Sequence, residues 1–336
     1  MTMDPRSVDC PVTDATHAGG ARRAVTLLAK QQGMDATATG KTALIVTELA
    51  NNLAKHAGGG HILLRPLGRE RKAGIEILAV DKGPGMADPA RCFQDGYSTA
   101  GTPGTGLGSV SRTADRWDIY STPGEGTVIM AQVGKEDLEG SRLETGAVCV
   151  AMKDEPACGD IWSHLWNPER ERVMLADGLG HGPRAAEAAE EAAMVLREKE
   201  GHALPEVMEA MHGALKKTRG AAVAVAEVDF ERGVVRYIGV GNISGVIVQN
   251  AQTRSMVSYN GTVGHELRKV QEFQYPWPAN GLLVLCSDGL SNRWDFRRYP
   301  GLAMRHPAVI AGVLWRDHNR GRDDATIFVA RKRAAK

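Results

Sequence analysis

The stretches L-A-D-G-L-G-H-G (175–182) and C-S-D-G-L-S-N (286–292) decide the fold of the second half of this chain. Each places an Asp-Gly pair directly after an apolar run, at Asp177 and at Asp288. Asp-Gly after a strand ordinarily indicates a hairpin turn, but a hairpin needs a second alternating strand at once. A helical pattern follows the first stretch, and a polar segment without alternation follows the second. We therefore predict that both aspartates lie at strand ends and face a shared space.

Two further phrases place aspartate beside an apolar strand: C-G-D-I-W with Asp160, and R-D-D-A-T-I-F-V with Asp323 or Asp324. Carboxylates gathered at strand ends cannot all stay ionised without cations, and an uncompensated buried charge is costly. An all-oxygen ligand set suits magnesium or manganese and not zinc. Two such ions activate water and clamp a phosphoryl group for in-line attack. The alternative is a set of solvated loop aspartates with no shared role.

The composition indicates a globular protein of mixed α and β content. The chain has 336 residues, a net charge of +1 and five scattered cysteines, none in C-x-x-C spacing. We therefore expect a cytoplasmic protein with no disulfide framework and no nucleic-acid or membrane partner. The N-terminal M-T-M-D-P-R-S-V-D lacks a signal-peptide core, and no apolar run is long enough to span a bilayer. The oligomeric state stays open.

The polar, glycine-bounded segment 134–146 predicts a domain boundary, with domains at 1–134 and 146–336 joined by a linker at 135–145. Periodicity in the first domain predicts helices at 17–33, 38–57 and 107–116, and strands at 61–66, 74–81, 117–121 and 127–133. In the second domain, many short strands are interrupted by a helix pair at 183–199 and 204–218. That pattern favours a layered α/β/β/α sandwich.

In the helix at 38–57, Glu48 and Asn52 share a face with the apolar Leu44. A carboxylate and an amide within an apolar stripe are costly unless something polar meets them. That partner is either a ligand or a local group, such as a helix cap or a Glu–Lys pair with Lys41 or Lys55. The sequence leaves both possibilities open.

Two glycine-rich phrases favour the ligand. D-K-G-P-G-M (81–86) ends a strand with the acceptor Asp81, and Gly83 and Gly85 then permit close approach to a ligand. G-T-P-G-T-G-L-G-S (101–109) leads into a helix N-terminus, where free N–H groups and the helix dipole favour phosphate. It lacks the G-K-[ST] ending of a Walker A loop.

The order E-L-A-N-N, D-x-G-x-G, G-T-G-L-G and G-E-G-T over residues 15–133 resembles the GHKL ATP-binding fold, and most of all the RsbT-like serine/threonine kinases. The resemblance implies that Glu48 acts as general base or orients the attacking hydroxyl, and that Asn52 holds Mg²⁺. It implies that Asp81 accepts the adenine amino group, with Gly85 admitting the ring. The remaining implied residues are Gly83 in the D-x-G-x-G motif, Gly104, Gly106 and Gly108 in the phosphate lid, and Thr127 behind the adenine.

The phrases G-D, A-D-G-L-G-H-G, S-D-G-L and R-D-D-A-T over 145–332 resemble the SpoIIE/RsbX branch of the metal-dependent PPM phosphatases. The resemblance implies that Asp177 bridges two metal ions and that the Gly178 carbonyl also binds. It implies that Asp160 serves one ion and that Asp288 and Asp323 serve the other. His181 is expected as a neighbouring or leaving-group residue. Arg142 and Arg172 are candidate phosphate-gripping cations, and G-V-G-N-I-S-G (239–245) is expected to frame the site.

Together the resemblances predict an α+β protein of two domains. The first is a GHKL two-layer sandwich, a mixed sheet with helices on one face, and the second is a PPM four-layer sandwich. The predicted function is bifunctional. ATP-dependent phosphorylation of a partner, expected to be a STAS-domain protein of an anti-sigma pathway, would be combined with phosphoserine or phosphothreonine dephosphorylation. Mg²⁺ would serve the kinase, and two Mn²⁺ or Mg²⁺ the phosphatase. The alternative is a phosphatase whose first domain only binds ATP or a partner.

Overall fold

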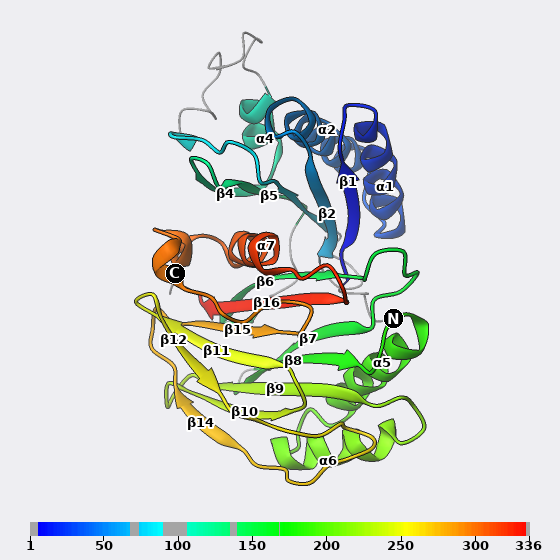
Figure 1. Ribbon diagram of the computed structural model, residues 1–336, viewed down its shortest axis with the longest axis vertical. Coiled ribbons are helices and arrows are strands. Elements are labelled where there is room, and N and C mark those ends of the chain that lie inside the picture. The colour runs from blue at the N-terminus through cyan, green and yellow to red at the C-terminus, as the bar shows by residue number, and fades with distance from the viewer. Residues whose placement is uncertain (1–5, 68–73, 90–105, 135–139, 168, 334–336) are drawn as a thin grey trace. The chain divides into compact units, whose positions relative to one another are not determined.

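The computed structural model describes residues 6–67, 74–89, 106–134, 140–167 and 169–333 (Figure 1). The chain divides into two compact units, Met1–Leu138 and Glu139–Lys336. Each unit has its own sheets, helices and apolar core, and each is described by itself.

In its described residues, the first unit consists of a five-stranded sheet and the helices α1 (His17–Gln31), α2 (Ala36–Asn52) and α4 (Gly106–Thr113) (Figure 1). Apolar side chains from the helices and from one face of the sheet form its core, among them Val25, Ile45, Leu49, Ile62 and Ile129. The strands, in spatial order, are β1 (Val8–Val12), β2 (Gly60–Leu67), β3 (Gly74–Val80), β5 (Gly126–Gly134) and β4 (Arg116–Thr122).

The described strand pairings of this sheet are all antiparallel, so the expectation of a mixed sheet is wrong. The reason lies in the strand order. β3 and β4 run in the same direction with α4 between them in the chain, but β5 lies between them in the sheet. The two strands of like direction are therefore never neighbours.

Helix α2 begins at a cap in which Asp35 Oδ1 accepts from Ala38 N at 2.7 Å. It ends at Asn52, and the chain continues as a π-helical turn, η1 (Leu53–Ala57). The wider turn brings Ala57 against Gly83, where an added β-carbon would lie 2.7 Å from Ala57 Cα. Leu44, on the same face as Glu48 and Asn52, is 44% exposed.

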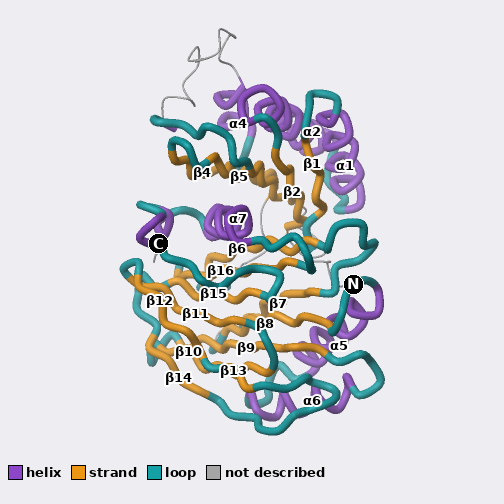
Figure 2. The backbone as a smooth tube through the Cα atoms, in the orientation of Figure 1, coloured by secondary structure: helices purple, strands orange, loops and turns teal. Residues whose placement is uncertain are grey.

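Two sheets form the centre of the second unit (Figure 2). The first has the order β13 (Ser258–Tyr259), β10 (Val234–Val240), β9 (Ala221–Asp229), β8 (Glu171–Gly178) and β7 (Asp160–Trp166), and β14 (Phe273–Pro276) also pairs with β10. The second has the order β12 (Gln252–Met256), β11 (Ser244–Gln249), β15 (Leu282–Cys286), β16 (Ala325–Lys332) and β6 (Leu143–Val150).

Helices cover the outer faces of both sheets. Helices α5 (Pro183–Glu198) and α6 (Leu204–Leu215) pack on the first sheet, and α7 (Pro307–His318) packs on β6 and β16 of the second. Two short 3₁₀ turns, η2 (Phe296–Arg298) and η3 (Leu302–Met304), precede α7. On β8, Leu175 faces the core between the sheets and Met174 faces the helices, as strand alternation requires. The predicted α/β/β/α layering is confirmed.

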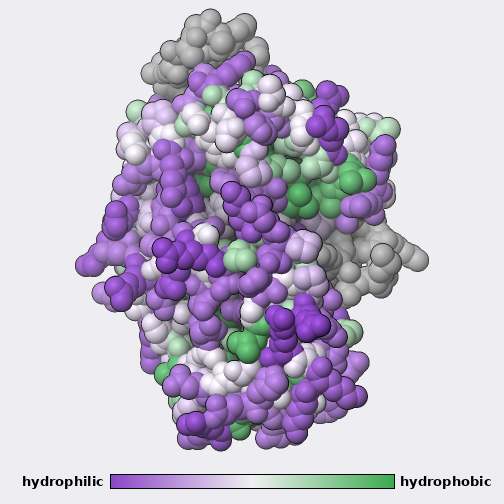
Figure 3. All heavy atoms as spheres, turned by 45° about the vertical axis from the view of Figure 1, so that its right-hand side comes forward, coloured by the Kyte–Doolittle hydropathy of each residue, from purple (hydrophilic) through white to green (hydrophobic). Residues whose placement is uncertain are grey.

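The face drawn in Figure 3 is largely hydrophilic, with apolar side chains gathered in a few places. Among the described residues, none of the helices is both long enough and apolar enough to cross a membrane.

Candidate functional sites

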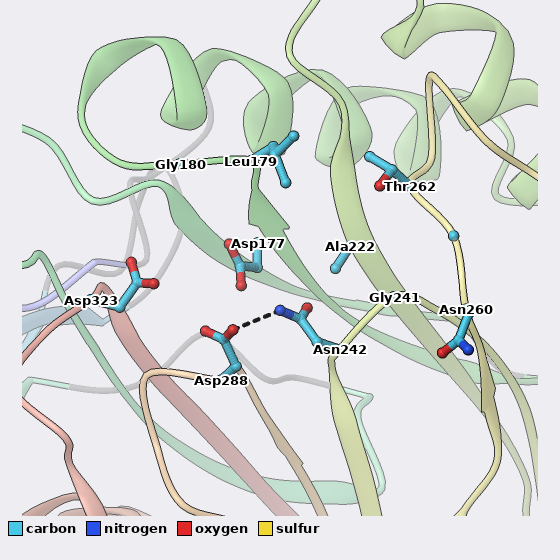
Figure 4. A pocket seen from close by; sticks show the side chains of 11 residues that line it. Asp177, Leu179, Gly180, Ala222, Gly241, Asn242, Asn260, Thr262, Asp288 and Asp323 are labelled. Atoms are coloured by element: carbon cyan, nitrogen blue, oxygen red, sulfur yellow. Dashed lines mark hydrogen bonds between the residues drawn. The ribbon is translucent and has the colours of Figure 1, made fainter.

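A cavity of about 380 Å³ opens at the strand ends of the second unit (Figure 4). Three carboxylates line it: Asp177 at the end of β8, Asp288 just after β15 and Asp323 just before β16. These residues come from both sheets, so segments far apart in sequence meet here. The other lining residues are Leu179, Gly180, Ala222, Gly241, Asn242, Asn260, Gly261 and Thr262.

Asp160, the fourth predicted carboxylate, lies beneath the cavity and does not line it. It is fully buried, and it stands directly opposite Asp177 in the β7–β8 ladder. Its Oδ2 accepts a hydrogen bond from Ser287 Oγ at 2.7 Å. The cluster therefore has three members at the cavity and one behind them.

Burial and mutual repulsion raise the pKa values of these carboxyls. Burial, followed by repulsion from Asp160 and Asp288, raises the pKa of Asp177 to about 9. Burial raises the pKa of Asp160 to about 7, against the hydrogen bond from Ser287. Burial and Asp323 raise the pKa of Asp288, which Asn242 opposes. A bound cation would relieve this repulsion.

The neighbouring residues Asp323 and Asp324 have different surroundings. Both oxygens of Asp324 accept backbone N–H groups, from Met152 at 2.7 Å and from Gly159 at 2.8 Å, and its side chain is buried. Asp324 therefore fixes the loop before β7. Asp323 is half-buried and lines the cavity, and its Oδ1 accepts from Asp324 N at 2.9 Å.

The glycines of the two Asp-Gly pairs lie where no side chain fits. A β-carbon on Gly178 would lie 1.9 Å from Ala185 O, and one on Gly289 would lie 1.9 Å from Asp324 O. The Asp-Gly pairs therefore place backbone tightly against α5 and against the start of β16. His181, four residues after Asp177, is exposed, and its Nδ1 is 2.6 Å from Glu155 Oε1.

Arg142 and Arg172 are not phosphate-binding residues, so that expectation is wrong. Arg172 is buried, and it donates to Glu227 Oε2 at 2.7 Å and to Glu200 O at 2.7 Å. Arg172 lies near the start of β8, about 17 Å along the strand from Asp177 at the usual rise per residue. Arg142 packs its guanidinium over the Phe230 ring at 3.9 Å.

Sequence reasoning missed several cavity residues. Asn242, in the expected framing segment 239–245, donates from Nδ2 to Asp288 Oδ2 at 2.7 Å (Figure 4). Asn260 and Thr262 complete a neutral polar wall, and the Asn-Gly pair at 260–261 was the signal that could have indicated this turn. Arg219 is also close, because its Nη1 would lie 3.0 Å from a β-carbon on Gly180.

The donor set fits hard divalent cations, since the cavity offers carboxylate and amide oxygens and no sulfur or imidazole. Within the described ranges, no three His, Cys, Asp or Glu side chains already stand close enough together to grip one ion. Ser287 and Asn242 hold Asp160 and Asp288 by hydrogen bonds.

In the first unit, Glu48 and Asn52 lie beside the first residue of α4. A β-carbon on Gly106 would lie 3.1 Å from Glu48 Oε2 and 3.7 Å from Asn52 Oδ1. Lys41 lies 3.8 Å from Asp115, and in the described part of the chain no Glu48–Lys pair forms. The two polar side chains thus face a helix N-terminus, a place that favours an anion. Gly108 is buried within α4.

Asp81 follows β3, and backbone donors hold its carboxylate in one orientation. Its Oδ1 accepts from Gly83 N at 2.8 Å and from Thr127 N at 3.1 Å. Thr127 Oγ1 is 2.8 Å from Ser121 Oγ, which also accepts from Met86 N. These bonds join the predicted adenine residues into one network.

Gly85 has φ +66, and a β-carbon there would lie 2.1 Å from Thr122 O, so backbone packing alone demands glycine. Gly104 lies outside the described residues.

Comparisons with known proteins find relatives for both halves of the chain. A family model described as stage II sporulation protein E (SpoIIE) matches residues 167–333, and one described as a histidine kinase-like ATPase domain matches residues 11–132. Over 104 residues the chain is 36% identical to the serine/threonine-protein kinase RsbT of Bacillus subtilis (strain 168), covering 31% of this chain and 78% of that protein.

The second half has relatives of its own. Over 154 residues the chain is 20% identical to the phosphoserine phosphatase RsbX of Bacillus subtilis (strain 168), covering 46% of this chain and 77% of that protein. A solved structure from work on the bacterial stressosome, a modular system adapted to control secondary messenger signaling, aligns with a TM-score of 0.53 and 26% identity. That alignment covers 57% of this chain and all of the other. The chain therefore belongs to the family of RsbT-like proteins with a histidine kinase-like ATPase domain through its first unit, and its second unit carries a SpoIIE domain similar to RsbX.

Proposed function

We propose that the second unit dephosphorylates phosphoserine or phosphothreonine of a partner protein, using two Mn²⁺ or Mg²⁺ ions. The observation that supports this proposal is the meeting of Asp177, Asp288 and Asp323 from three separate strand ends around one cavity. All-oxygen donors and raised carboxyl pKa values both fit cations at this place. The name of the relative RsbX, a phosphoserine phosphatase, points to the same substrate class.

Each residue has a proposed role. Asp177 and the Gly178 carbonyl would hold both ions. Asp160 would contribute to one of them, and Asp288 and Asp323 would contribute to the other. When bound, the ions supply an activated water and a clamp for the phosphoryl group. Asp324 keeps the loop at 152–159 in place through its two backbone hydrogen bonds.

We propose Arg219 as the cation that meets the substrate phosphate. It lies beside Gly180 at the cavity wall, and within the described chain it makes no ion pair. An arginine guanidinium matches a phosphate with two parallel donors, which gives both charge and geometry. Arg142 and Arg172 cannot serve, since their groups are committed elsewhere.

We propose that the first unit, residues 1–134, binds ATP and Mg²⁺ and transfers the γ-phosphate to a serine or threonine of the partner. Glu48 orients or deprotonates the attacking hydroxyl, Asn52 holds Mg²⁺, and Asp81 accepts the adenine amino group. The position of Glu48 and Asn52 beside the N-terminus of α4 supports this assignment. The other residues proposed to surround the nucleotide are Gly83 and Gly85 near the adenine, Thr127 behind it, and Gly104, Gly106 and Gly108 in the phosphate lid.

The proposed partner is a STAS-domain protein of an anti-sigma or stressosome-type pathway, because RsbT and a stressosome structure are among the relatives. Opposed activities in one chain would set the level of partner phosphorylation. The second candidate is a phosphatase whose first unit only binds nucleotide. Glu48 favours the kinase, since a binding module needs no base at that place.

Labelled ATP and a purified STAS-domain protein separate these candidates. With an active kinase, label reaches the partner with wild-type protein, accumulates with Asp177→Ala and is absent with Glu48→Ala. Equal labelling by wild type and Glu48→Ala would contradict the kinase assignment. Manganese-dependent hydrolysis of p-nitrophenyl phosphate that survives the double change Asp177→Ala and Asp288→Ala would contradict the phosphatase site.

A further inference from the structure

Asn242 lies in the turn between β10 and β11 and reaches Asp288 across the cavity wall. Its Nδ2 donates to Asp288 Oδ2 at 2.7 Å (Figure 4). An amide NH₂ group only donates, so this nitrogen cannot itself hold a cation. Through this nitrogen, Asn242 can act on a bound cation only by way of the Asp288 carboxylate.

The backbone around Asn242 is held from both sides. Gly241 has φ +94, its N–H donates to Tyr259 O at 2.8 Å, and an added β-carbon would lie 2.5 Å from Ala222 Cβ. Ala222 is the residue paired with Asp177 in the β8–β9 ladder. The turn that carries Asn242 is thus packed against the strand position beside Asp177.

The other side of the turn is tied to the strand that leads to Asp288. Ser244 begins β11 and pairs with Cys286, two residues before Asp288. Both partners of the hydrogen bond are therefore fixed to the same pair of strands. Such a bond is charge-assisted, and it restricts the rotation of the carboxylate.

We infer that Asn242 is a positioning residue, which turns Asp288 so that Oδ1 faces the cations while Oδ2 stays occupied. This inference rests on the proposed function, because it needs cations at the cavity. Partners that orient a metal ligand are typically worth 10–100-fold in metal affinity. Asn242 is exposed, so removing its side chain leaves the core packing intact.

The test measures Mn²⁺ binding to the full-length protein by calorimetry, with wild type, Asn242→Ala and Asn242→Ser. We expect both variants to raise a manganese Kd about 10–100-fold, with the metal-free melting temperature unchanged. The Mn²⁺ electron paramagnetic resonance spectrum of the bound ion should change as well. Asn292→Ala is the matched control, because exposed Asn292 donates to Ser244 Oγ at 2.8 Å in the same region.

Wild-type affinity in Asn242→Ala would overturn the inference. An equal loss in Asn292→Ala would also overturn it, since any disturbance near the turn would then suffice. Wild type that binds no manganese would overturn the inference together with the metal site. If the wild-type protein binds manganese but hydrolyses no phosphoserine, only the proposed function is contradicted. The manganese Kd of Asn242→Ala then still decides the role of Asn242.

Discussion

The substitution Asp177→Asn should stabilise the protein without metal and destabilise it, relative to wild type, with metal. Asp177 stands directly opposite Asp160 in an antiparallel pair, where β-carbons are about 4.5–5.5 Å apart. Two charges about 5 Å apart repel by about 3 kcal/mol at an effective dielectric constant of about 20. The raised pKa of each carboxyl means that protons already relieve part of this repulsion. We therefore expect a gain of about 1–3 kcal/mol in the metal-free protein.

With manganese, the wild-type protein should become more stable than Asp177→Asn. Ligand at about 100 times its Kd stabilises a folded protein by about 2.7 kcal/mol, and the variant should lose most of this gain. Each kcal/mol shifts the melting temperature of a unit this size by about 2–4 °C. Scanning calorimetry of the full chain, with chelator and then with manganese, resolves both changes.

Asp324→Asn provides the control, because it makes the same charge change next to the same cluster. Both oxygens of Asp324 accept backbone N–H groups, so an amide there turns a donor toward a donor. It should lower the free energy of unfolding by about 1–3 kcal/mol with or without metal. If Asp177→Asn also lowers the metal-free melting temperature, the repulsion argument is refuted.

Three further predictions concern pH, substrate and nucleotide. The pKa values of Asp160 (about 7) and Asp177 (about 9) lie above the ordinary 3.8, so the folded state binds more protons than the unfolded state between these limits. The free energy of unfolding of the metal-free protein should therefore fall from about pH 5 to about pH 8, and urea titrations in which it rises would contradict this. Arg219→Ala should raise KM for a phosphopeptide about tenfold with little change in kcat, as measured by steady-state kinetics. Arg172→Ala, in contrast, should lower the free energy of unfolding by about 3–5 kcal/mol, as measured by melting curves. Asp81→Asn should weaken ADP binding about 10–100-fold at an unchanged melting temperature, and unaltered ADP calorimetry would remove Asp81 from the adenine site.

The strand-end aspartates could be predicted because an Asp-Gly pair after an apolar run is a local signal. The same holds for the helices and for the layer order of the second unit, which depend on short-range periodicity. The strands β1, β12, β13 and β14 were not predicted, since they are short or polar edge segments. The partners of β1, β13 and β14 are also distant in sequence, whereas β12 forms a hairpin with β11.

Long-range contacts explain what the sequence could not decide. Arg172 was a plausible phosphate ligand until Glu227, 55 residues away, appeared as its partner. The roles of Asp323 and Asp324 differ because Asp324 accepts from Met152 N and Gly159 N, 172 and 165 residues away, and composition does not reveal such long-range contacts. The mixed sheet was expected from the resemblance to the GHKL fold, and the position of β5 between β3 and β4 excludes it.

The most direct test of the central claim is the anomalous scattering of manganese in crystals of the full-length protein. We predict two manganese peaks, about 3.5–4 Å apart, between Asp177, Asp288 and Asp323, with the nearer ligand oxygens at about 2.0–2.6 Å. Manganese bound elsewhere on the chain, with this cavity empty at saturating concentration, would contradict the account.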